Sequence, residues 1–137
     1  MEKFNQWNEV KKSSHAKERK VGFKARDIFW VRIGQNIGSE EFGKGNEFQR
    51  PVLILRKLTH DLFIGVPLTS VLKEDNDYFY TFEFLNKQKK ETSKNSAMIL
   101  QLKNFDKKRL MGKIGVINKN DFNMILEKVR DLFIPLK

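Results

Sequence analysis

GSEEFGKGNEFQRPVLILRKLTHDLFIGVPLTS, residues 38–70, is the stretch of sequence from which the fold can be predicted. It contains two short apolar runs, at residues 52–55 and 62–68, with a polar turn at residues 59–61 between them. Apolar runs separated by such a turn are typical of a β-hairpin. The sequence therefore predicts two antiparallel strands that are joined at this turn.

The predicted hairpin gathers polar side chains at its open end. Because the start of one strand lies opposite the end of the other, we expect Arg50 to lie close to Thr69 and Ser70. The preceding loop, residues 38–49, is then expected to lie over them and to bring the carboxylate of Glu40 nearby. A cation, two hydroxyls and a carboxylate at one end of a sheet predict a site, and an ordinary hairpin with charged ends is the alternative.

Further short strands are predicted outside the hairpin. Their apolar and aromatic residues alternate or form short runs, as in strands, and they span residues 27–34, 78–84, 96–102 and 112–117. Residues 87–95 are hydrophilic and rich in lysine, so a loop is predicted there. Asp106 is predicted to cap a single helical turn.

Helices are predicted near both ends of the chain. Residues 2–12 show a short amphipathic pattern that a polar, basic linker follows, so we assign residues 1–25 to an N-terminal extension and residues 26–137 to the folded domain. Asn118 is expected to cap a C-terminal helix whose apolar residues recur with a 3.6-residue period and which ends at Pro135. Short strands followed by this helix indicate an α+β fold, in which the helix packs on a small, strongly bent antiparallel sheet or barrel.

The composition of the 137-residue chain limits its chemistry. The chain has no cysteine, which excludes disulfides, thiol catalysis and cysteine-ligated zinc. Its two histidines, His15 and His60, are far apart in sequence, and nothing around them suggests a metal site or a catalytic pair. No apolar run reaches the ~18 residues of a membrane span and no signal-peptide pattern is present, so a cytoplasmic protein is expected. The glycine-bearing loop matches no nucleotide-binding motif, so nucleotide-triphosphate chemistry is not expected.

The net charge indicates a class of partner. Lys and Arg number 27 against 17 Asp and Glu, which gives a net charge of +10. A positive field of this size favours nucleic acid, an anionic membrane or an acidic protein as the partner. The basic linker near the N-terminus is suited to contact a phosphate backbone, and a solvated tether is the alternative.

The order of short motifs along the chain resembles a known family. A first strand is followed by GSE at residues 38–40, RPVLIL at 50–55, PLTS at 67–70, QLKxxDKKRL at 101–110, KIGxI at 113–117 and a final helix that contains DF. This order resembles the MazF/PemK family of mRNA interferases, the toxins of type II toxin–antitoxin systems. The resemblance implies a CcdB/PemK-type β-barrel and a homodimer. It also implies an acidic cognate antitoxin and cleavage of single-stranded RNA without a metal or other cofactor, with no membrane partner.

The resemblance implies roles for individual residues. Arg50 of the RP motif and Thr69 of the LTS motif match the family's catalytic pair, and Glu40 of GSE matches the acidic residue of its site. Gln101 matches the glutamine of the family's QIR pattern, whereas Lys103 stands in place of its arginine. Lysine keeps the charge but loses the planar fork that binds a phosphate through two hydrogen bonds.

The same motifs predict a division of labour in the site. The residues predicted to bind the substrate are Ser39, Lys44, Ser70, Gln101 and Lys103. Arg50 is suited to stabilise the negative charge that develops on phosphate during attack by the ribose 2′-hydroxyl. Thr69 can hydrogen-bond a phosphate oxygen or relay a proton, and Glu40 is either the base or an ion-pair partner that orients Arg50. The alternative to an enzyme is a non-catalytic barrel protein, either an inhibitor like the gyrase poison CcdB or a decayed toxin that only binds.

Overall fold

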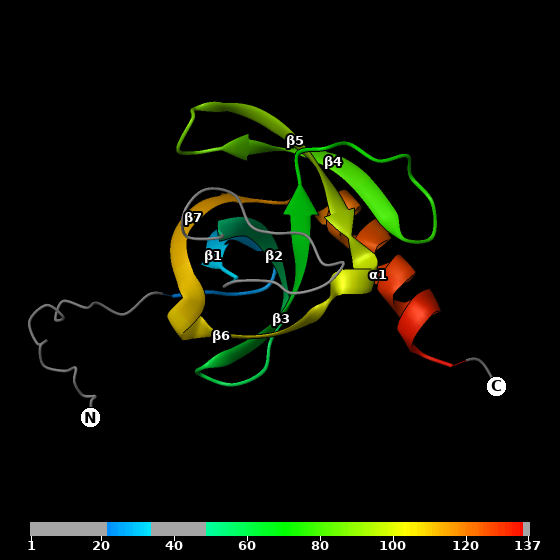
Figure 1. The fold of residues 1–137 in the computed structure, drawn as a ribbon, viewed down its shortest axis with the longest axis horizontal. Coiled ribbons are helices and arrows are strands. Elements are labelled where there is room, and N and C mark those ends of the chain that lie inside the picture. Colours follow the sequence, from blue (N-terminus) through cyan, green and yellow to red (C-terminus); the bar gives the residue numbers. More distant parts are fainter. Residues whose placement is uncertain (1–21, 34–48, 136–137) are drawn as a thin grey trace, which may run out of the picture.

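The computed structural model describes residues 22–33 and 49–135, and Figure 1 shows how its elements are arranged. In chain order the strands are β1 (Asp27–Arg32), β2 (Gln49–Lys57), β3 (Leu62–Thr69), β4 (Phe79–Asn86), β5 (Glu91–Met98), β6 (Lys103–Asp106) and β7 (Leu110–Val116). The short 3-10 helices η1 (Ile99–Gln101) and η2 (Lys107–Arg109) flank β6, and the helix α1 (Lys119–Phe133) follows β7. The helix predicted at residues 2–12 and most of the linker after it lie outside the described residues.

The strands form one strongly curled antiparallel sheet, a half-barrel with the order β4-β5-β3-β2-β1-β7 (Figure 1). Strand β3 has β2 along one edge, whereas β6 and then β5 pair with successive parts of its other edge. The helix α1 packs on one side of this sheet and contributes Phe122 and Ile125 to the core. The predicted α+β fold, a bent antiparallel sheet with a C-terminal helix packed on it, is confirmed.

Two clusters of buried side chains cover the two faces of the sheet. The helix-side core lies against α1 and includes Leu53 and Val66, which come from β2 and β3. The barrel core lies on the opposite face and includes Val52, Phe63 and Phe105. Because successive residues of a strand point to opposite faces, β2 contributes to both cores, which explains its uninterrupted apolar run.

Strands β2 and β3 form the hairpin that the apolar runs predict. Val52 lies opposite Pro67 in antiparallel register. The register shifts between Ile54 and Arg56, where β2 carries one residue more than β3. Such a bulge bends a strand and increases its twist, which favours the curl of the whole sheet.

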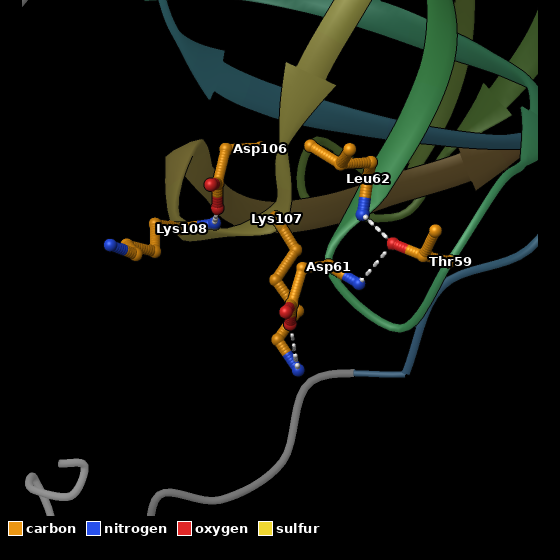
Figure 2. A network of polar contacts seen from close by, with 6 residues as sticks. All are labelled: Thr59, Asp61, Leu62, Asp106, Lys107 and Lys108. Atoms are coloured by element: carbon orange, nitrogen blue, oxygen red, sulfur yellow. Dashed lines mark hydrogen bonds and ion pairs between the residues drawn. The ribbon is translucent and has the colours of Figure 1, made fainter. Parts of the chain in front are cut away.

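Side chains from two parts of the sequence hold the turn of this hairpin (Figure 2). Thr59 Oγ1 accepts hydrogen bonds from the backbone nitrogens of Asp61 and Leu62, at 3.0 and 3.1 Å. Lys107 donates its backbone N–H to the backbone oxygen of Asp61 over 2.7 Å, and its Nζ lies 3.7 Å from the Asp61 carboxylate. Because Lys107 begins η2, these contacts fix β6 and η2 against the hairpin.

Both predicted caps are present. The Asn118 side chain accepts a hydrogen bond from the backbone nitrogen of Asp121 at the start of α1, and Asp106 accepts one from that of Lys108 in η2, at 2.8 and 2.9 Å. Tyr80 of β4 also fixes α1, because its hydroxyl donates to Asp121 Oδ1 over 2.6 Å. Burial and this hydrogen bond raise the pKa of Tyr80 to about 12.

The far end of the β4–β5 ribbon, defined as residues 79–98, reaches the opposite edge of the sheet. Lys87 donates its backbone N–H to the backbone oxygen of Ile114 on β7 over 2.8 Å. A Cβ at Gly115 would lie 2.6 Å from Cδ2 of Phe84 and 2.8 Å from the backbone oxygen of Leu85. Only glycine permits so close an approach of the two edges, so this contact helps to close the half-barrel.

Two predictions are wrong in the segment after β4. Residues 87–95, predicted as a loop, contain β5 from its start up to Asn95, and the strand predicted at residues 96–102 ends at Met98, where η1 follows. The short strand β6 is not predicted at all. Residues 91–94 carry no apolar side chain and therefore show no alternation, but pairing with the aromatic strand β4 holds them in a strand.

Candidate functional site

Arg50 and Thr69 lie across from each other at one end of the β2–β3 hairpin, as the sequence predicts. The register that places Val52 opposite Pro67 places Arg50 opposite Thr69 when it is continued along the two strands. Arg50 Nη1 also donates to the backbone oxygen of Leu68 over 3.3 Å. Both side chains lie on the barrel-core face, since alternate residues of a strand share a face, and they are only 4% and 2% exposed.

This pair belongs to a row of polar side chains that crosses four neighbouring strands. Thr69 lies opposite Ser96 of β5, and Ser96 lies opposite Thr81 of β4. Because directly opposite residues share a face, we define the polar row as Arg50, Thr69, Ser96 and Thr81. Ser96 is completely buried, and polar groups at that depth need hydrogen-bond partners.

The hydroxyls of the polar row bind the chain segment that leaves β3. Ser96 Oγ accepts a hydrogen bond from the backbone nitrogen of Lys73 over 2.9 Å, and Thr81 Oγ1 donates to the backbone oxygen of Lys73 over 3.0 Å. Since Thr81 has a single hydroxyl proton, Ser96 is the donor in the 2.5 Å contact between the two hydroxyls. Thr69 Oγ1 accepts from the backbone nitrogen of Val71 over 3.1 Å. These hydroxyls therefore fix the backbone that follows Ser70.

Ser70 and Gln101, both predicted to bind the substrate, lie on the surface. Ser70 is exposed directly after the buried Thr69, at the point where β3 ends. Gln101 is exposed at the end of η1, and its Nε2 lies 3.7 Å from the sulfur of Met98. Neither position contradicts a substrate contact, and their roles remain predictions.

Lys103 begins β6 and lies opposite Gly65 of β3. Gly65 and Thr69 are four residues apart on one strand, so Lys103 lies on the same face of the sheet as Thr69, at about 13 Å along the strand. Its Nζ lies 5.4 Å from the ring centroid of Phe105, a cation–π contact that restricts the side chain. The structure thus places this lysine on the face that carries Arg50.

Ser39, Glu40 and Lys44 fall within residues 34–48, outside the described residues. The carboxylate and the two substrate contacts predicted there therefore stay predictions. Sequence reasoning did not identify Ser96 and Thr81. The one available signal is that Thr81 is a small polar residue between two aromatic residues in the strand sequence FYTFEF at residues 79–84.

The described residues include no group of three or more His, Cys, Asp or Glu side chains that could hold a metal ion. In the same part of the chain, no helix is long and apolar enough to span a membrane. A guanidinium held beside a hydroxyl can bind and stabilise a phosphate oxyanion through charge-assisted hydrogen bonds.

Most of the chain matches one protein family. Residues 24–133 match the family of PemK-like, MazF-like toxins of type II toxin–antitoxin systems. No curated protein sequence matches this chain significantly.

Solved structures share the curled sheet and helix. The Mycobacterium tuberculosis toxin MazF-mt6 is 16% identical with a TM-score of 0.56, over 79% of this chain and 96% of the other. An endoribonuclease in complex with its cognate antitoxin, from a mycobacterial species, is 12% identical with a TM-score of 0.61, over 85% and 100%. A MazE–MazF structure from Deinococcus radiodurans is 14% identical with a TM-score of 0.58, over 85% and 100%. At such identities the likeness shows the fold alone.

Proposed function

Because this chain belongs to the PemK-like, MazF-like toxins of type II toxin–antitoxin systems, we propose that it is an endoribonuclease that cleaves single-stranded RNA without a metal ion. The observation that carries the proposal is the position of Arg50 across from Thr69 at one end of the β2–β3 hairpin, with Arg50 hydrogen-bonded to the backbone of the neighbouring Leu68. The net charge of +10 supports an RNA substrate, since a positive field concentrates polyanions at the surface.

In the proposed reaction the ribose 2′-oxygen attacks the neighbouring phosphorus, and the bond from phosphorus to the 5′-oxygen breaks. The products are a 2′,3′-cyclic phosphate and a 5′-hydroxyl. Arg50 donates hydrogen bonds to the non-bridging oxygens, where negative charge develops in the transition state. Thr69 hydrogen-bonds one of these oxygens, and Glu40 accepts the proton of the 2′-hydroxyl. The departing 5′-oxygen takes up a proton from water and leaves as the 5′-hydroxyl. The sequence selectivity of cleavage is assigned to Ser39, Lys44, Ser70, Gln101 and Lys103.

Single-stranded RNA fits this chemistry better than a duplex. In-line attack requires the 2′-oxygen, the phosphorus and the 5′-oxygen to align, which a stacked helix prevents. Arg50 and Thr69 are almost fully buried, so a phosphate can reach them only when the groups that cover them move aside. Binding of the substrate and opening of the site are therefore coupled in this proposal.

The proposal extends to partners and assembly. An antitoxin with an acidic segment complements the net charge, and two of the structurally similar proteins are described as complexes with an antitoxin or as MazE–MazF. We propose a homodimer that acts in the cytoplasm, as the resemblance implies. Light scattering of the purified chain measures the assembly directly.

The test of the enzyme is incubation of purified protein with a long single-stranded RNA in EDTA, followed by mapping of the ends. Discrete cuts that bear 2′,3′-cyclic phosphate are expected from the wild type. Loss of the Arg50 contact is expected to reduce the rate by roughly 100-fold, as loss of an oxyanion-hole donor does. The matched control is Arg56→Ala, because Arg56 is an exposed arginine on the same strand.

Burial of Arg50 and Thr69 also favours a second candidate, a non-catalytic barrel protein that binds RNA or a protein target. Folded wild-type protein that leaves several diverse RNAs intact would support this candidate and overturn the enzyme. Equal loss of activity in Arg50→Ala and Arg56→Ala would show that a general loss of charge, rather than the site, controls cleavage.

A further inference from the structure

Lys94 of β5 lies on the same face of the sheet as the catalytic candidates. It is two residues before Ser96, which pairs with Thr69, and alternate residues of a strand share a face. The distance along β5 from Ser96 to Lys94 is about 7 Å. Lys94 is exposed, and although Glu83 of β4 lies directly opposite it, no ion pair joins the two in the part of the chain described by the structure.

Lys94 and Lys103 flank the Arg50–Thr69 pair from opposite directions. Strand β5, the short helix η1 and strand β6 follow one another along the same edge of β3. Thr69 lies beside β5 near one end of this edge, whereas Lys103 lies beside Gly65. The order along the edge is therefore Lys94, the site, and Lys103, over a span of about 20 Å.

The charge around the site differs between its two neighbouring segments. The β4–β5 ribbon carries four exposed lysines, Lys87, Lys89, Lys90 and Lys94, against the exposed carboxylates at residues 83 and 91, so its charge is positive. The segment that leads from β3 to β4 instead carries exposed carboxylates at residues 74, 75 and 77. A polyanion that leaves the site is attracted towards the ribbon and repelled from the segment at residues 74–77.

We propose that the β4–β5 ribbon is a binding surface for the RNA backbone, with Lys94 as the phosphate contact on the side of the cleavage site opposite to Lys103. This inference rests on the proposed function and specifies how its substrate lies. The RNA strand runs along β5, η1 and β6, with its scissile phosphate at Arg50 and Thr69. The lysines at the tip of the ribbon contact phosphates further along the RNA.

The first test measures binding of a 2′-O-methyl RNA, which lacks the attacking hydroxyl and is not consumed, as a function of salt concentration. The logarithm of the binding constant falls with the logarithm of the salt concentration, and loss of one phosphate contact on single-stranded RNA reduces the magnitude of this negative slope by about 0.7. We expect this change for Lys94→Gln and for Lys103→Gln, and about twice the change for the double variant. Lys119→Gln is the control, because Lys119 is exposed on α1, which packs on the opposite face.

The results separate this inference from the proposed function. A Lys94→Gln slope equal to that of Lys119→Gln overturns the ribbon surface, whether or not the protein cuts RNA. A reduced slope in a protein that cuts nothing supports the surface and removes the enzyme. If the wild type binds no single-stranded RNA, both proposals fall.

The second test determines the path of the RNA strand across the protein. Since the chain contains no cysteine, Lys94→Cys and Lys103→Cys each create a single attachment point for a photo-crosslinker. We expect the two variants to cross-link to nucleotides on opposite sides of the cleaved bond. Cross-links to the same nucleotides would contradict the proposed path.

Discussion

The β2–β3 hairpin and the β4–β5 ribbon are both antiparallel strand pairs, but they are stabilised in different ways. The hairpin has neighbouring strands along both edges and buried side chains on both faces, with Leu53 on one face and Phe63 on the other. The ribbon is covered on one face alone, where Phe82 and Phe84 pack, and Leu85 on its outer face is 62% exposed. One pair of strands is part of the core, and the other has a free surface.

This difference separates two tasks in the proposed enzyme. A buried hairpin holds Arg50 and Thr69 in a fixed relation, which a preorganised catalytic pair requires. An exposed ribbon can carry lysines that contact a flexible polyanion without cost to the core. The polar row connects the two, because it begins in β2 and ends in β4.

The largest expected effect is on the free energy of unfolding, and it distinguishes a buried side chain of the hairpin from an exposed side chain of the ribbon. Phe63→Ala removes a completely buried ring that stacks at 5.4 Å on Phe105, and we expect a loss of about 4 kcal/mol in the free energy of unfolding. Leu85→Ala on the outer face of the ribbon is expected to change it by less than about 0.5 kcal/mol. Urea denaturation followed by circular dichroism measures both. Equal losses would show that the ribbon is packed on both faces.

The second prediction concerns the contact that joins the ribbon to β7. Gly115→Ala forces a methyl group against the ring of Phe84 and the backbone of Leu85, and we expect a loss of about 2 kcal/mol through overpacking. The control is Gly112→Ala on the same strand, where the nearest atom is the side-chain nitrogen of Gln88 at 3.4 Å. This variant is expected to keep nearly wild-type stability. Similar thermal unfolding midpoints for the two variants would contradict closure of the half-barrel at Gly115.

The same contrast explains which parts of the fold could be predicted. The hairpin was predictable because its two apolar runs and their turn lie within one short stretch, and Arg50 and Thr69 follow from its antiparallel geometry. The start of β5 was not predictable, since a strand with one free face and polar residues shows no apolar alternation. Its conformation depends on pairing with β4 rather than on its own sequence.

The polar row shows which part of the candidate site could not be predicted from the sequence. Thr69, Ser96 and Thr81 are distant in sequence and become neighbours only through the order β4-β5-β3. A shift of one residue in either pairing would turn Ser96 or Thr81 to the other face. Sequence motifs could therefore indicate Arg50 and Thr69, whereas Ser96 and Thr81 could be identified only once the register of the strands was known.

The third prediction tests whether the polar row positions the site. Thr81→Val removes the hydroxyl that donates to Lys73 and accepts from Ser96, and we expect a loss of about 1 kcal/mol in stability. If the row positions Thr69, kcat for RNA cleavage falls by up to about tenfold while KM changes little. Thr81→Ser keeps the hydroxyl and is expected to restore kcat. Equal kcat values in both variants, with stability lost in Thr81→Val alone, would limit the row to a structural role.

The smallest expected effect is a pH dependence at the junction of the ribbon with α1. Burial and the hydrogen bond to Asp121 raise the pKa of Tyr80 to about 12, so the folded state retains this proton at pH values at which the unfolded state loses it. The stabilisation is complete below the unfolded pKa of about 10 and is lost as the pH rises from there towards 12. Tyr80→Phe lacks both the hydrogen bond and the titration.

We therefore expect Tyr80→Phe to be less stable than the wild type by about 1 kcal/mol at pH 8. The difference should shrink when urea unfolding is repeated at pH values between 10 and 12. Tyr78→Phe is the control, because Tyr78 is exposed and lies two residues away. A gap between the Tyr80→Phe variant and the wild type that stays constant above pH 10 would show that the phenol does not hold its proton against Asp121.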